Sequence, residues 1–92
     1  MNGDEVALVI EVSDTTLQRD RTLKKAIYAR ASIPIYWIIN LSEAQIEVYT
    51  SPSGSSEKPD YQQRQDYRLD DQAPLVIDQQ EIARIAARDI LP

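Results

Sequence analysis

The stretch ALVIEVSDTT, residues 7–16, decides the fold around it. A short β-branched apolar run of this kind is typical of a strand buried on both faces. Glu11 interrupts the run, and a buried carboxylate is costly unless a cation or strong hydrogen-bond donors meet it. We therefore predict a strand over residues 6–12 in which Glu11 has a specific partner.

A helix is predicted to follow this strand, over residues 20–31. Its apolar residues recur every four positions, which predicts a core-facing stripe. The stripe consists of Leu23, Ile27 and Ala31. A second row with the same spacing lies on a neighbouring face of the helix and consists of Asp20, Lys24 and Tyr28.

The start of this helix has two interpretations. Thr15 and Gln18 have the spacing of a capping box, whereas Asp20 is suited to cap a later start. The sequence alone does not decide between them. Ser32-Ile33-Pro34 ends the helix, because proline disfavours helical geometry in the residue before it.

The rest of the chain predicts an α/β fold with a mixed sheet. Further strands are expected over residues 34–40, 44–50 and 61–69. The second of these alternates apolar with polar residues, which predicts that Gln45, Glu47 and Tyr49 lie on an exposed face. Tyr61 and Tyr67 are expected on one side of the third.

The C-terminal segment predicts a short strand followed by a second helix. The strand runs from Leu75 to Ile77, and Asp78 is placed as the N-cap of a helix over residues 79–89. Ile82, Ile85 and Ala86 would form the apolar stripe of that helix.

Composition limits the class of protein and its chemistry. The chain has 92 residues and a formal net charge of −5, which predicts a single domain over residues 1–92 and argues against a generic nucleic-acid-coating protein. It has no cysteine and no histidine, so catalysis would depend on carboxylates, lysine, arginine, tyrosine or hydroxyls. Without an apolar segment of about 20 residues or a signal core, we expect no membrane association and a cytoplasmic location.

Two residues are the main candidates for chemistry, and each also has a structural interpretation. Glu11, near the end of its strand, is suited to hold a divalent metal, but a glutamate satisfied by amides or by Lys24 is the commoner outcome. Lys24 is suited to stabilise charge on a phosphate, yet most lysines in basic helices face solvent. Tyr36 and Trp37 are candidates for base stacking, although at least one should be core.

Basic residues are concentrated in one segment. A local basic face could contact phosphate even on an acidic chain, although such a run is more often a solvated helix surface. The segment contains Arg19, Arg21, Lys24, Lys25 and Arg30.

The block over residues 9–50, VIEVSDTTLQRDRTLKKAIYARASIPIYWIINLSEAQIEVYT, is more specific than its periodicity. Its EVSD, the DR followed by lysine, and its YARA, IP and YWI resemble the Uma-two family of restriction endonucleases, within the PD-(D/E)XK nuclease superfamily. The resemblance covers nearly the whole chain and corresponds to the C-terminal half of the family's length.

This resemblance implies a restriction-endonuclease-like core, a mixed sheet flanked by helices. It implies metal-dependent hydrolysis of DNA phosphodiesters, with Mg²⁺ or Mn²⁺ held by Glu11 and with Lys24 as the catalytic lysine on the following helix. Ser13 stands where the superfamily pattern has its lysine. The metal-binding aspartate that relatives carry in a preceding strand has no counterpart, so we expect an N-terminally truncated, weak or inactive nuclease.

Two alternatives accompany the nuclease interpretation. The chain would then be either a non-catalytic remnant that binds a partner or pairs with itself as a homodimer, or a stable domain in which Glu11 and Lys24 form a buried ion pair. In the dimer a second copy would supply the other carboxylate.

Overall fold

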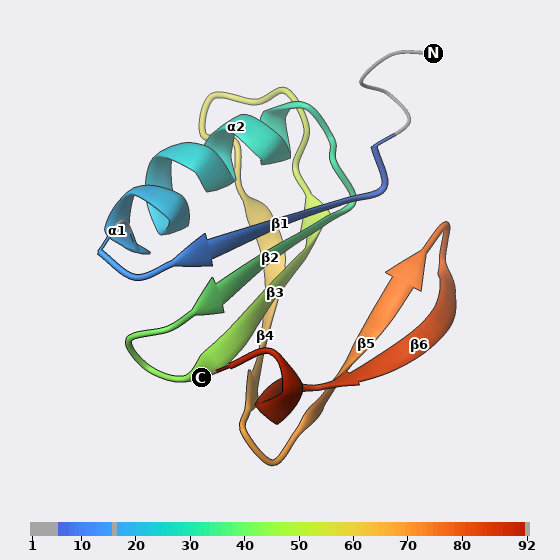
Figure 1. Ribbon diagram of the computed structural model, residues 1–92. Helices are drawn as coiled ribbons and strands as arrows, with labels where there is room; N and C mark the ends of the chain where they lie inside the picture. The colour runs from blue at the N-terminus through green and yellow to red at the C-terminus, as the bar shows by residue number, and fades with distance from the viewer. Residues whose placement is uncertain (1–5, 16, 92) are drawn as a thin grey trace.

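The computed structural model describes residues 6–15 and 17–91 and has a mixed α/β architecture (Figure 1). The described residues form six strands and four helical segments in the order β1, α1, η2, α2, β2, β3, β4, β5, β6 and η3. The segments α1, η2 and α2 follow one another without a break and are called the helix below. The strands are β1 (Leu8–Ser13), β2 (Ile35–Asn40), β3 (Gln45–Pro52), β4 (Tyr61–Arg68), β5 (Gln72–Ile77) and β6 (Gln80–Ala86). The helical segments are α1 (Leu17–Arg19), the π-helical η2 (Asp20–Lys24), α2 (Lys25–Arg30) and the 3₁₀ turn η3 (Ala87–Asp89).

Four of the strands form one sheet in the order β1-β2-β3-β4. β1 and β2 run parallel, with Glu11 beside Ile38, and a parallel pair requires the crossover that the helix provides. The pairs β2–β3 and β3–β4 are antiparallel. The predicted mixed sheet and its first four strands are therefore confirmed.

The sheet has a core on each face. The helix covers one face, where Tyr36, Ile38, Tyr49 and Tyr61 are buried. The hairpin β5–β6 and the C-terminal turn cover the other face around Trp37 (Figure 1). Tyr61 and Tyr67 belong to different cores, so the prediction that they share a side is wrong; β3 is irregular beside them, where Ser51 has a φ of 56°.

The helix presents its polar row, not its apolar row, to the sheet. Leu23 and Ile27 are 58% and 54% exposed, and Ala31 is exposed, so the predicted core-facing stripe is wrong. Asp20, a member of the polar row, is buried instead. The sheet face below carries polar side chains whose buried groups need hydrogen-bond partners, and the polar row supplies them.

The helix begins at Leu17, three residues before the alternative start at Asp20. Asp20 lies inside the helix, in a π-helical turn, and not at its start. The interpretation with Asp20 as cap is therefore wrong.

None of the helices in the described part of the chain is long and apolar enough to cross a membrane.

Two strands differ from their predicted burial. β1 is exposed at Ile10 and Val12, which are 46% and 62% accessible, because it lies at the edge of the sheet. β3 is instead buried on both faces, since it is a central strand between β2 and β4 under the helix. Gln45, Glu47 and Tyr49 are all buried, which contradicts the exposed face predicted for them.

The predicted C-terminal helix is wrong, because residues 80–86 form the strand β6. Asp78 is not an N-cap; with Gln79 it forms the two-residue turn of the β5–β6 hairpin, at φ values of 53° and 66°. In the run Leu75–Ile77, Val76 and Ile77 are β-branched, and the chain turns back directly after it. Backbone pairing with that run outweighs the weak helical preference of the segment after it.

The hairpin turn yields a prediction. Both central residues have positive φ, a conformation that glycine adopts without the strain of a Cβ. We expect Gln79→Gly to raise the free energy of unfolding by about 0.5–1 kcal/mol in urea denaturation. Gln80→Gly, one residue later in β6, is the control and should lower stability; equal effects of the two substitutions would contradict the turn geometry.

Candidate functional site

The site lies where the helix crosses the end of β1. Glu11 projects from β1 toward the helix, and the Lys24 ammonium lies 2.8 Å from its Oε2. The Tyr28 hydroxyl donates to Oε1 of the same carboxylate at 3.1 Å. Both oxygens of Glu11 therefore accept hydrogen bonds from one row of the helix, and the predicted partner of Glu11 is Lys24 together with Tyr28.

A second carboxylate lies below the same lysine. Asp20 is 1% exposed, accepts a hydrogen bond from the Ser13 hydroxyl, and has Oδ1 3.6 Å from the Lys24 ammonium. The Tyr36 hydroxyl donates to the Asp20 carbonyl at 3.3 Å. The Ser13 hydroxyl thus anchors the helix to the strand.

The electrostatics of this pair determine what Lys24 can do. The hydrogen bond to Glu11 raises the pKa of Lys24, and nearby Asp20 adds to that effect. Burial first, and then the hydrogen bond to Glu11, raise the pKa of Tyr28. Both groups remain protonated at neutral pH, so each serves as a hydrogen-bond donor and neither as a general base.

Beside the site lies a buried carboxylate that the sequence analysis missed. Glu47 on β3 is fully buried and accepts hydrogen bonds from two of the guanidinium nitrogens of Arg21, Nε and Nη2. The Tyr49 hydroxyl, Asn40 and Gln45 donate to it at 2.7, 2.9 and 3.0 Å. Burial raises the pKa of Glu47, but these donors outweigh it and lower the pKa to about 2. The Arg21–Glu47 pair therefore ties the helix, one turn before Lys24, to the centre of the sheet.

No sequence signal marked Glu47, because alternation alone cannot distinguish a solvent-facing strand from one covered by a polar helix face.

The other candidates do not contribute to a site. Tyr36 and Trp37 are both buried, in opposite cores, so base stacking by either is wrong. Lys25 pairs with Asp60 at 3.0 Å and lies over the Tyr49 ring. Arg21 and Lys24 are also paired with acids, whereas Arg19 and Arg30 of the basic segment are exposed.

The donors for a metal ion are too few among residues 6–15 and 17–91, which hold no group of three His, Cys, Asp or Glu side chains suited to one. Glu11 and Asp20 approach the same ammonium, and each carboxylate already accepts hydrogen bonds. The described residues alone do not fit a magnesium centre, since that ion requires near-octahedral oxygen coordination.

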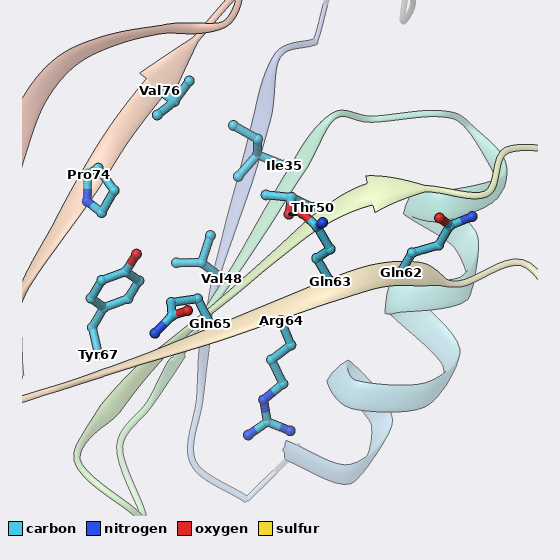
Figure 2. Close-up of a pocket in the computed structure, with 10 residues that line it drawn as sticks. All are labelled: Ile35, Val48, Thr50, Gln62, Gln63, Arg64, Gln65, Tyr67, Pro74 and Val76. Atoms are coloured by element: carbon cyan, nitrogen blue, oxygen red, sulfur yellow. Dashed lines mark hydrogen bonds between the residues drawn. The ribbon is translucent and has the colours of Figure 1, made fainter.

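A cavity of about 610 Å³ lies away from these groups, between β4 and the β5 strand (Figure 2). Its described lining includes no acid, and the side chains of Val48, Tyr67, Pro74 and Val76 give it an apolar wall. Arg64 points away from the other side chains, toward the helix (Figure 2). The candidate chemistry is therefore on the helix-covered face and not in this cavity.

A mixed sheet of four strands, with a helix connecting its two parallel strands, is consistent with a restriction-endonuclease-like α/β fold. The family model Uma2, described as "Putative restriction endonuclease", matches residues 2–81, and the chain belongs to this family. The resemblance noted from the sequence is thereby confirmed. No curated protein and no solved structure matches the chain.

Proposed function

We propose that this protein hydrolyses DNA phosphodiesters and that Glu11 and Lys24 are its catalytic residues. The observation that carries the proposal is the contact between the Glu11 carboxylate and the Lys24 ammonium at 2.8 Å, at the C-terminal half of β1. Membership of a family described as restriction endonucleases supports the nuclease class.

Access and charge support a role for Lys24 beyond structure. Its side chain is 39% exposed, whereas that of Glu11 is 20% exposed, so the ammonium can meet a phosphate while the carboxylate orients it from below. A cation in this position stabilises the negative charge that develops on a phosphate oxygen during hydrolysis. Tyr28 holds the other oxygen of Glu11 and so fixes the orientation of the carboxylate.

Metal dependence belongs to the same proposal. The family resemblance implies Mg²⁺ or Mn²⁺ with Glu11 as a ligand, but the described residues supply too few donors to complete such a site. We therefore expect weak metal affinity and slow turnover from a single copy of the chain, and we assign no reaction step to the metal.

A plasmid-nicking assay tests the proposal. In Mn²⁺ or Mg²⁺, we expect slow conversion of supercoiled to open-circular DNA, and a loss of at least about 100-fold in rate in Glu11→Gln and in Lys24→Ala. Lys25→Ala removes a neighbouring lysine that pairs with Asp60, and it should retain the parent rate. Nicking that persists in Glu11→Gln, or no nicking by the folded parent, would contradict the proposal.

A further inference from the structure

The strand β4 lies at one edge of the four-stranded sheet, and the described residues place no strand beside its outer side (Figure 1). An edge strand presents a row of backbone donors and acceptors that can pair with another strand. The opposite edge strand, β1, directly follows residues outside the described part of the chain, and its pairing stays open. The chain before and after β4 is described throughout, so the surroundings of the β4 edge can be followed residue by residue.

The backbone bonds at the end of β4 show which residues point their polar groups toward the free edge. The Arg68 N–H donates to the Asp71 carboxylate at 2.8 Å, and the Arg68 carbonyl accepts from the Asp71 N–H at 2.9 Å. Both groups of Arg68 therefore point away from β3. Backbone groups alternate along an antiparallel strand, so those of Gln62, Arg64 and Asp66 point outward as well. Asp71 closes the edge at Arg68 and leaves the stretch before it open.

The side chains of this open stretch alternate in charge. Arg64 and Asp66 are 41% and 39% exposed and pair with each other at 2.8 Å. Charged side chains protect many edge strands from pairing, because a row of one sign repels a second copy of itself. On β4 a basic and an acidic side chain stand two residues apart, so the open edge is complementary in charge to its own copy.

We propose that a second copy of this chain pairs with this edge, β4 against β4, around a two-fold axis perpendicular to the sheet. A two-fold contact uses the same patch on both copies, and strands related in this way run antiparallel. The two four-stranded sheets then join into one, with both helices on the same face. This interaction goes beyond the proposed nuclease function and does not depend on it.

The register of this pairing follows from the charges. An axis through Arg64 or through Asp66 would place two like charges directly opposite each other, which is destabilising. An axis through Gln65 places Arg64 of each copy opposite Asp66 of the other. The outward backbone groups of these residues then meet, and each opposed pair exchanges two hydrogen bonds.

The remaining opposed pairs are compatible with this register. Gln65 faces its own copy, and an amide both donates and accepts, so the two side chains can hydrogen-bond to each other. Gln63 faces Tyr67 of the second copy, and the other charged side chain of the strand, Arg68, faces Gln62. An axis moved to Gln63 or to Tyr67 would pair a shorter length of the strand. No like charges are directly opposed in the Gln65-centred register.

This dimer keeps the two Glu11–Lys24 sites apart. β1 and β4 lie at opposite edges of each sheet, so the joined sheet carries the sites at its two outer ends. The second copy therefore does not supply the further carboxylate that a metal would need, unlike the homodimer expected from the sequence. The interface and the nuclease activity can be tested separately.

Light scattering over a dilution series tests the dimer. The parent should have twice the 10.5 kDa mass of one chain and should dissociate on dilution. Asp66→Arg brings an arginine opposite Arg64 of the second copy at an exposed position, so the chain should fold and its dimerisation should weaken by at least about tenfold. Glu81→Arg is the matched control and should dimerise like the parent, because Glu81 is 43% exposed and also pairs with an arginine of its own strand. A monomeric parent, or equal dimerisation of the two variants, would overturn the proposal.

Disulfide formation tests the register. The chain contains no cysteine, so Gln65→Cys introduces a single thiol on the proposed axis, directly opposite its own copy. Air oxidation with a copper catalyst should convert most of this variant to covalent dimer. Gln62→Cys is the control on the same strand, since it lies three residues from the axis and roughly 20 Å along the strand from its own copy. It should crosslink at least about tenfold less; equal crosslinking of the two variants would contradict the Gln65-centred pairing.

The two proposals fail in different ways. A dimer that Asp66→Arg dissociates, but that nicks no DNA, supports the interface and contradicts the nuclease. Nicking by a parent chain that light scattering shows to be monomeric contradicts the interface and leaves the catalytic assignment of Glu11 and Lys24 in place.

Discussion

Arg21→Ala is expected to lower the free energy of unfolding by about 3 kcal/mol. The substitution removes from the fully buried Glu47 the guanidinium that binds both of its oxygens and leaves Arg64, 3.6 Å from Oε2, as a more distant cation; a poorly compensated buried charge is among the costliest defects in a protein interior. The loss is limited because Tyr49, Asn40 and Gln45 still donate to the carboxylate. Since small domains are stable by only about 5–15 kcal/mol, the effect will be large.

Urea denaturation followed by circular dichroism measures this loss. Arg30→Ala is the matched control, because it removes an exposed arginine from the last turn of the same helix. It should change stability by less than about 0.5 kcal/mol. If the two alanine variants unfold at the same urea concentration, the Arg21–Glu47 pair does not anchor the helix.

Acid is expected to destabilise the fold through Glu47. The pKa of its carboxyl is lowered from 4.5 to about 2 in the folded chain, by donors that outweigh the effect of burial. A depressed carboxyl pKa contributes stability that is fully present above 4.5 and is lost as the pH falls toward 2. At about 1.4 kcal/mol for each pH unit between those values, the loss is about 3 kcal/mol.

Chemical denaturation at pH 5 and at pH 2.5 checks this dependence, with Glu47→Gln as the comparison. The glutamine variant will be less stable at pH 5, but it should lose less between the two pH values because it has no proton to gain at position 47. A carboxyl ¹³C titration gives a second readout, in which Glu47 should remain ionised at pH 3.5. Parallel losses in parent and variant would contradict the role assigned to Glu47.

The pairing of Glu11 with Lys24 shows how much of the candidate site local sequence patterns can predict. The carboxylate in an apolar run predicted a partner, and the row Asp20, Lys24 and Tyr28 was visible at four-residue spacing. The structure brings two members of that row to Glu11 and buries the third next to Ser13. Spacing identified the row, but not that it faces the sheet.

The wrong predictions have a common cause. Periodicity identifies a face of an element but not what covers it, so Leu23 and Ile27 were placed inward although the polar row packs on the sheet. For the same reason Glu47 was placed outward, although the helix covers its face of β3. In the C-terminal segment, the spacing of Ile82 and Ile85 fitted a helix, yet pairing across the Asp78–Gln79 turn made it a strand.

The sequence by itself determined the class of fold, the first four strands, the helix between the first two, and the family, because β-branched runs, a proline stop and specific motifs are local properties of the chain. Only the tertiary structure decided which helix face is buried, where Glu47 finds its donors, and which strand is left at the edge. These three features depend on which surfaces pack together. Buried polar groups need hydrogen-bond partners, and those partners can lie anywhere in the sequence.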